Sequence, residues 1–143
     1  DMLEPMSDEE RTLVLLKPDA VRRHLMGEII GRYEAKGLTV RAMELSTIDA
    51  KTARKHYAEH VGRDYYVLLE EFITSGPLVA MVLEGRKAIS VVRAMNGKTD
   101  CAEALPGTIR GDFGTEKNHN LVHASDSPES AEREISLWFP NLV

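Results

Sequence analysis

Short apolar runs and helical spacings alternate along the chain. Apolar runs bounded by charges or turn residues predict strands at 11–17, 78–83 and 121–123, and the alternation of Leu38, Val40 and Ala42 predicts another at 38–46. Between the strands at 11–17 and 38–46, Val21, Leu25, Ile29 and Tyr33 recur every four residues and predict one helix over 19–36, ended at Gly37. Further helices are predicted at 50–60, 64–75 and 86–95.

The last third of the chain changes character. Residues 96–118 are glycine-rich and have no periodicity, so they predict a long irregular connection. Ser127, Pro128 and Glu129 then supply a hydroxyl cap, a first-turn proline and an acid, which together start a terminal helix. The resulting order of elements favours an α+β fold, a ferredoxin-like sandwich in which a four-stranded antiparallel sheet is covered by helices.

Composition limits the class of protein. The 143 residues contain no repeat or linker, which predicts one domain at 11–143 after a flexible tail at 1–10. The formal net charge of -5 disfavours both nucleic acid as the main ligand and an anionic membrane. Cys101 is the only cysteine, and no apolar run approaches the length of a membrane helix. Because residues 1–10 also lack the pattern of a secretory signal, we expect a cytoplasmic protein.

A polyanionic ligand would need a local cluster of cations. Gly97-Lys98-Thr99 resembles the end of a P-loop, but Val92 stands where the first glycine is required, so a Walker-type site is rejected. Arg110 lies among glycines in 106–114 and could offer a fork to phosphate oxygens, although such a loop is also typical of a plain connection. Further phosphate-binding candidates are Lys17, Arg93 and Thr99.

Five histidines offer candidate nucleophiles. His24, His56, His60 and His119 are interpreted as surface or core-edge residues. His123 ends a strand before a polar turn, where a neutral imidazole could attack phosphorus if an acceptor held its other nitrogen. Glu134 shares a helix face with Ala131 and Trp138 and could be that acceptor, although a surface-edge glutamate fits the spacing equally well.

Other site chemistry is less marked. Tyr65 and Tyr66 open a helix and could present an aromatic face to a base, but aromatic residues at such positions are more often core. The chain has neither Cys/His ligand spacing nor an acidic calcium loop, so Mg²⁺ would enter with nucleotide phosphates.

Taken in order, several motifs resemble the nucleoside diphosphate kinase family over 11–139. The matching stretches are RTL at 11–13, KPDA at 17–20, HY at 56–57, Phe72 with SGP at 75–77, PGTIRGDF at 106–113, NLVH at 120–123 with SDS at 125–127, and AEREISLWF at 131–139. The resemblance implies a ping-pong transfer of the γ-phosphoryl group from a nucleoside triphosphate to a nucleoside diphosphate. It also implies Mg²⁺ bridging the phosphates and a homo-oligomer, with a hexamer favoured over a tetramer.

The resemblance also assigns roles to residues. It implies that His123 becomes phosphorylated, that Glu134 orients it, and that Lys17 and Tyr57 belong to the catalytic set. It implies further that nucleotide is bound by Lys17, Tyr65, Leu69, Arg93, Thr99, Arg110 and Asn120.

Three positions depart from the family pattern. Ala124 stands where glycine is typical, which matters only if the backbone there needs a positive φ. The stretch at 63–66 replaces Pro-Phe-Phe and adds hydroxyls near the base, and Cys101 replaces a frequent proline. A non-catalytic nucleotide sensor and an anion-binding regulatory module are the alternatives, and the intact NLVH and PGTIRGDF stretches argue against both.

Overall fold

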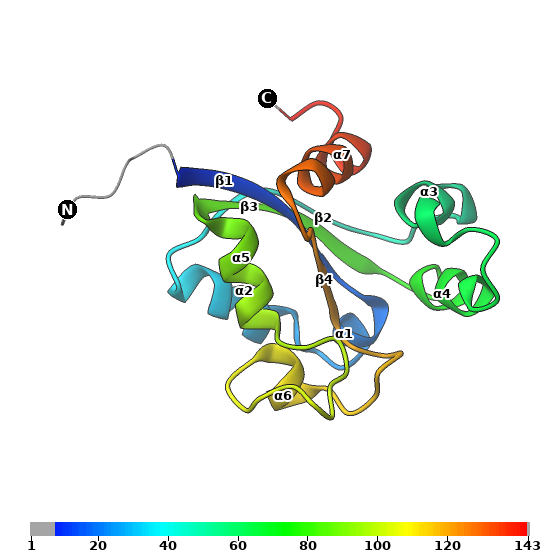
Figure 1. The fold of residues 1–143 in the computed structure, drawn as a ribbon, viewed down its shortest axis with the longest axis horizontal. Helices are drawn as coiled ribbons and strands as arrows, with labels where there is room; N and C mark the ends of the chain where they lie inside the picture. The colour runs from blue at the N-terminus through cyan, green and yellow to red at the C-terminus, as the bar shows by residue number, and fades with distance from the viewer. Residues whose placement is uncertain (1–7, 143) are drawn as a thin grey trace.

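Four antiparallel strands form the centre of the molecule. The computed structural model describes residues 8–142, and its strands are β1 (Glu9–Leu16), β2 (Thr39–Ser46), β3 (Leu78–Arg86) and β4 (Val122–Ala124). Their order in the sheet is β2-β3-β1-β4, and every neighbouring pair is antiparallel (Figure 1). The predicted α+β, ferredoxin-like fold with a four-stranded antiparallel sheet is confirmed.

Helices cover both faces of this sheet. The remaining elements are α1 (Pro18–Arg22), α2 (Met26–Ala35), α3 (Ala50–His56), the 3₁₀ turn η2 (Ala58–His60), α4 (Tyr66–Ile73), α5 (Ala88–Asn96), α6 (Ile109–Phe113) and α7 (Pro128–Trp138). One core cluster joins Val14 and Leu16 of β1 to α1, α2, α5 and α6. The opposite cluster joins Leu13 and Leu15 to α3, α4 and α7. Because β1 is packed on both faces, its interior is a continuous apolar run rather than an alternating one.

Alternation along β4 decides which core each of its residues meets. Val122 and Ala124 face the first cluster, whereas His123 pairs with Leu15 and therefore shares the face of α3, α4 and α7. The strand begins one residue later than predicted, because Leu121 has a positive φ of 73° and is not extended. This short strand places one histidine beside α7.

Three further predictions differ from the structure. The single helix expected over 19–36 is two helices, since His24 adopts a positive φ of 60° between α1 and α2. The irregular stretch at 96–118 contains α6, whose first turn is capped by the side chain of Thr108. The expected tail at 1–10 falls mainly on residues 1–7, which lie outside the described residues, but Glu9 and Glu10 are paired in β1 with Arg86 and Gly85.

Candidate active site

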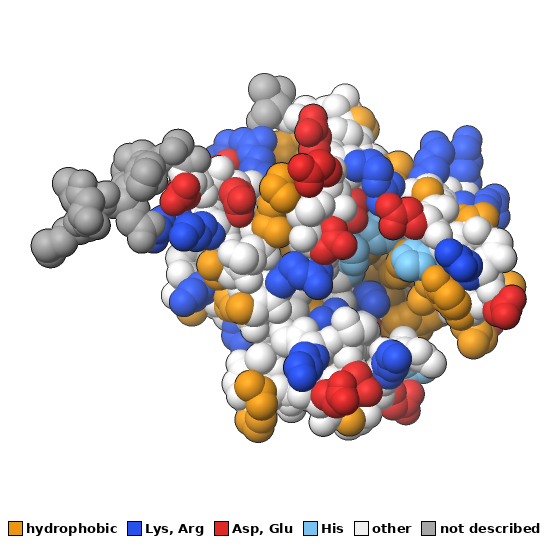
Figure 2. All heavy atoms as spheres, in the orientation of Figure 1, with side chains coloured by type: hydrophobic (Ala, Val, Ile, Leu, Met, Phe, Trp, Pro, Cys, Tyr) orange, Lys and Arg blue, Asp and Glu red, His pale blue; other side chains and the backbone are white. Residues whose placement is uncertain are grey.

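A cavity of about 280 Å³ lies where the end of β1, β4, α3, η2, α5 and α7 meet. Its lining includes four cations and three histidines, namely Lys17, Arg93, Arg110, Arg133, His56, His60 and His123. Figure 2 shows histidine side chains in this hollow, with Lys and Arg side chains around it. A net-negative chain thus concentrates positive charge at one concave place, as a polyanionic ligand requires.

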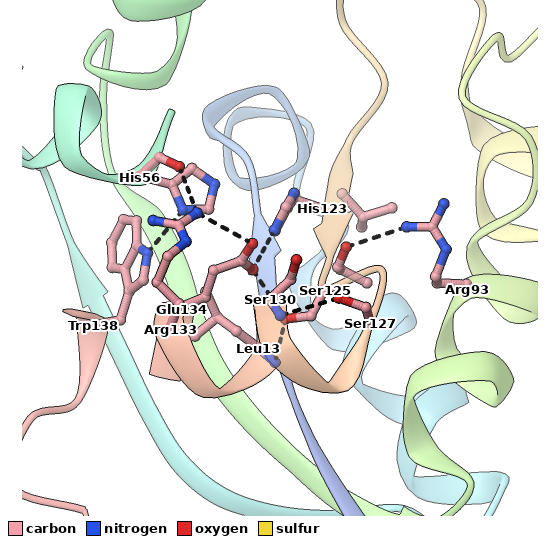
Figure 3. Close-up of polar contacts among 12 residues, drawn as sticks. Leu13, His56, Arg93, His123, Ser125, Ser127, Ser130, Arg133, Glu134 and Trp138 are labelled. Carbon is pink, nitrogen blue, oxygen red and sulfur yellow. Dashed lines mark hydrogen bonds and ion pairs between the residues drawn. The ribbon is translucent and has the colours of Figure 1, made fainter. Parts of the chain in front are cut away.

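A chain of hydrogen bonds holds His123 from the inner side of the cavity. Nε2 of His123 lies 2.8 Å from Oε1 of Glu134, and the same oxygen accepts from the hydroxyl of Ser125 at 2.9 Å. The backbone N–H of Leu13 donates in turn to the Ser125 hydroxyl at 3.2 Å (Figure 3). An ionised carboxylate can only accept, so Nε2 of His123 carries the proton and Nδ1 keeps a free lone pair.

Burial makes this arrangement rigid. Glu134 is 5% exposed and Ser125 is fully buried, whereas the side chain of His123 keeps 23% exposure. Glu134 lies on the inner face of α7 with Ala131, as the helical spacing suggested, and not at the surface edge. A buried carboxylate is costly unless it is paired, and its two donors here satisfy it.

Leu121 fixes the backbone that leads into His123. Its carbonyl accepts from the backbone N–H of Lys17 at 2.8 Å, and its own N–H donates to Oδ2 of Asp19 at 3.1 Å. A left-handed leucine is uncommon and strained, and here it is fully buried and bonded on both sides. These bonds to the turn after β1 set the register of β4.

Lys17 is held at the end of β1 by Asn120. Its Nζ donates to Oδ1 of Asn120 at 2.8 Å, and the Asn120 amide donates to the carbonyl of Thr99 at 3.3 Å. Burial, and then the nearby Arg110, lower the pKa of Lys17 to about 8. The ammonium is therefore charged at neutral pH but close to titration.

Arg110 is engaged mainly with the backbone. Its guanidinium donates to the carbonyls of Val122 at 2.6 Å, Gly97 at 2.8 Å and Asn120 at 3.1 Å. Three of its five N–H groups are thus directed at carbonyls that lead into β4 and out of α5. Arg110 lines the cavity as expected, but its fork also ties the strand to the loop.

Three other residues that line the cavity make fewer hydrogen bonds than Lys17 and Arg110. Arg93 is exposed on α5 and donates to the carbonyl of Ala124 at a long 3.4 Å, and Thr99 is exposed beside it. Tyr57 follows α3, and burial raises the pKa of its phenol to about 12, so it stays a neutral donor. All three line the cavity.

The predicted base contacts lie beyond the lining residues. Tyr65 is 48% exposed, and its hydroxyl is 2.7 Å from Nδ1 of His60. Leu69 is half-buried on α4. Sequence reasoning placed these two residues next to the site, but the described cavity wall includes neither.

His56 is the site residue that sequence reasoning missed. It is 4% exposed, lines the cavity, and its ring meets that of His123 edge-on at 4.6 Å between centroids. Its surface or core-edge interpretation is wrong, and its position three residues after buried Ala53 on α3 was the available signal. His60 also lines the cavity, whereas His24 and His119 are exposed elsewhere.

Two of the residues that depart from the family pattern, Ala124 and Cys101, are buried. Ala124 is buried in β4, and its φ is not positive, so its methyl group meets no backbone strain. Cys101 is buried below Gly114, where any added side chain would collide with its sulfur. Burial raises the pKa of the Cys101 thiol, which makes it a poor nucleophile.

Metal binding by protein atoms alone fits poorly. Within residues 8–142, His56, His123 and Glu134 form one group whose donor atoms lie within 4.8 Å of one another. His123 and Glu134 are already bound to each other by a hydrogen bond, and His56 uses its Nδ1 lone pair to accept from Trp138.

No helix in residues 8–142 has the length and hydropathy needed to cross a membrane.

Comparisons with known proteins agree along the whole described chain. A family model described as Nucleoside diphosphate kinase matches residues 10–142. A nucleoside diphosphate kinase from Cutibacterium acnes is 91% identical over 138 residues, which are 96% of this chain and 100% of the relative. One from Nocardioides is 65% identical over 92% of this chain and 98% of the relative.

Solved structures give the same answer. A nucleoside diphosphate kinase from Halobacterium salinarum in complex with CDP has a TM-score of 0.90 at 47% identity, covering 93% of this chain and 89% of that one. The enzyme from Borrelia burgdorferi, a transition state mimic with vanadate and ADP, has a TM-score of 0.87 at 37% identity, covering 94% and 89%. With the motifs, the fold and the histidine site in agreement, this chain belongs to the nucleoside diphosphate kinase family.

Proposed function

We propose that this protein transfers the γ-phosphoryl group of a nucleoside triphosphate to a nucleoside diphosphate through a phosphohistidine at His123. The observation that carries the proposal is the Nδ1 of His123, which has no hydrogen-bond partner within residues 8–142 and lies in a cation-lined cavity while Glu134 holds Nε2. Donor and acceptor nucleotides occupy the same cavity in turn, which makes the reaction ping-pong.

The proposed roles of the lining residues follow from their positions in the cavity, and those of Tyr65 and Leu69 follow from the family resemblance. Nδ1 of His123 attacks the γ-phosphorus while Glu134 stabilises the positive charge that develops on the imidazole. Lys17, Arg93 and Arg110 neutralise phosphate oxygens, and Tyr57 donates its phenol hydrogen bond to the transferring group. Thr99 and Asn120 position the phosphates and the ribose, and Tyr65 and Leu69 contact the base at the rim.

We propose that Mg²⁺ enters with the nucleotide. The cavity rim offers the oxygen donors of Glu59 and Asp126, which suit the water shell of a hard cation better than a full protein cage. Bound between the phosphates, the ion would supply further charge neutralisation during transfer.

We also propose a homo-oligomer, with a hexamer favoured over a tetramer, acting in the cytoplasm. Met43 and Leu45 are 56% and 57% exposed on the edge strand β2, and Leu105, just before the 106–113 stretch, is 71% exposed. Apolar side chains on an open edge strand favour a covering partner. Native mass measurement distinguishes six copies from four.

Labelling with ATP carrying ³²P at the γ position tests the function. The protein is expected to acquire acid-labile, alkali-stable phosphate, and to pass it to an added nucleoside diphosphate. His123→Ala is expected to remain folded and to lose both steps, whereas His119→Ala, on an exposed histidine outside the cavity, keeps them. Equal labelling of the two variants would refute the assignment. A non-catalytic nucleotide sensor would bind nucleotide with no label in any variant.

A further inference from the structure

His56 is a buried histidine that the proposed chemistry leaves without a role. Its ring lies between Trp138 and His123, with centroid distances of 5.5 Å and 4.6 Å (Figure 3). It comes from the last turn of α3, and its backbone carbonyl accepts from Arg133 of α7 at 3.2 Å. A polar ring in such a position needs hydrogen-bond partners for both nitrogens.

The indole of Trp138 fixes the tautomer of this ring. Its Nε1–H donates to Nδ1 of His56 at 3.1 Å. An indole nitrogen can only donate, so Nδ1 must hold a lone pair and the single proton of a neutral His56 lies on Nε2. A tautomer is usually ambiguous, but here the partner leaves only one choice.

The surroundings keep His56 neutral. Burial lowers its pKa well below the usual value, and the charges of His123, Arg133, Lys17 and His60 act in the same direction. The carboxylate of Glu134 already accepts from His123 and from the Ser125 hydroxyl, and the other carboxylates that line the cavity, Glu59 and Asp126, make no hydrogen bond to His56 within residues 8–142. A second proton on His56 would therefore lie near the cations Lys17 and Arg133 and would face the Trp138 N–H.

The Nε2–H group is directed into the cavity. Among residues 8–142, the enclosed side-chain polar atoms without a partner are those of Thr12 and Asp19, so Nε2 of His56 is not enclosed. No residue of the described part of the chain accepts a hydrogen bond from this nitrogen, and His56 lines the cavity beside His123. The His56 and His123 rings meet edge-on with centroids 4.6 Å apart, and both line the cavity. A group bonded to His123 on the cavity side therefore lies beside both rings, at a distance that a hydrogen bond from His56 can span.

We propose that Trp138 locks His56 in its Nε2–H tautomer, so that His56 serves as an uncharged hydrogen-bond donor to the phosphoryl group on His123. The inference rests on the proposed function, because it needs a phosphoryl group at His123. A neutral donor suits this place, since it stabilises oxygens of the transferring group in both half-reactions without adding a fixed cation that would trap the phosphohistidine.

Nuclear magnetic resonance tests the lock without any turnover. The chain has one tryptophan and five histidines, so its indole N–H gives a single signal and the imidazole ¹⁵N shifts can be assigned by substitution. We expect the ¹⁵N shifts to show a neutral Nε2–H form of His56 that does not titrate between about pH 5.5 and 8. Trp138→Phe should release the Nδ1–H form. An Nδ1–H or charged His56 in the unaltered protein would overturn the inference.

Single-turnover phosphorylation tests the donor. His56→Phe keeps a ring but has no N–H, and it should slow phosphorylation by about ten- to a hundred-fold with little change in nucleotide affinity. His56→Gln restores an N–H donor and should be at least about threefold faster than His56→Phe. The phosphorylation rate of Trp138→Phe should lie between the rates of these two variants and the rate of the unaltered protein.

Phe139→Leu is the matched control, because Phe139 packs in the same core cluster as Trp138 and carries no polar contact to His56. If Phe139→Leu slows phosphorylation as much as His56→Phe, or if His56→Gln is no faster than His56→Phe, His56 acts only through packing and the proposal is wrong. Absence of phosphorylation in the unaltered protein would instead refute the proposed function, while the resonance result would still stand on its own.

Discussion

The two ends of the cavity are held in different ways. At the inner end, His123, Glu134 and Ser125 form a bonded chain that begins at the backbone of β1, and two of the three side chains are buried. Just beyond the outer end, Tyr65 is half exposed and is anchored by one hydrogen bond to His60, which lines the cavity. Chemistry on phosphorus needs fixed geometry, whereas a part of a ligand that varies between substrates is better met by an adaptable contact.

The largest expected effect comes from breaking the inner chain. Glu134→Gln keeps the shape of the side chain but removes the charge that supports the imidazole, so phosphorylation should slow by about 100-fold or more. Nucleotide affinity, measured separately by equilibrium binding, should change little. Glu129→Gln, on the exposed first turn of the same helix, is the control. A loss confined to affinity would contradict the orienting role.

Arg110→Lys tests whether the inner end is also structurally rigid. One ammonium cannot serve the three carbonyls of Gly97, Asn120 and Val122, so the free energy of unfolding should fall by about 2 kcal/mol. Arg54→Lys, in an exposed pair with Glu70 near the outer end, should cost less than about 0.5 kcal/mol. Urea denaturation measures both, and equal losses would remove the contrast between the two ends.

The pH dependence of binding probes Lys17. With a pKa of about 8, this ammonium is mostly protonated at pH 7 and mostly neutral at pH 9. Raising the pH through this window removes a positive charge, so the KM for nucleoside triphosphate should rise several-fold. Lys17→Arg keeps its positive charge at pH 9, so the KM of this variant should not rise with pH, even if it differs from the KM of the unaltered protein at pH 7. A flat KM in the unaltered protein would show that Lys17 does not contact phosphate.

The smallest effect is expected at the rim. Tyr65→Phe loses only the bond to His60, so KM should change by less than about threefold and kcat should not change. The factor should be the same for adenine, guanine and cytosine nucleotides, because a stacking contact does not read base edges. A tenfold or base-dependent change would mean that the outer end is as specific as the inner one.

Sequence patterns predicted the central strands β1 and β3 well because these strands are buried on both faces and read as apolar runs, and alternation predicted the more exposed β2. They failed at His24 and Leu121, where positive φ values belong to residues that carry no turn signal. Glu134 remained ambiguous on the helical wheel, and only tertiary structure shows the buried partners that decide its role. His56 was missed because its partner, Trp138, is 82 residues away in the chain. Long-range contacts of this kind leave no local pattern.

The three-residue length of β4 has a consequence for how this family can change over time. A slip of one residue would turn His123 toward the opposite core and replace it with an aliphatic side chain. Because Leu121 is tied to Lys17 and Asp19, insertions and deletions upstream, between α6 and Asn120, can be absorbed without moving the strand. Between Leu121 and His123 no change in length is neutral. The loop between α6 and Asn120 is therefore free to vary in length. The fixed spacing from Leu121 to His123 keeps the reactive histidine on the side of the sheet that faces α7.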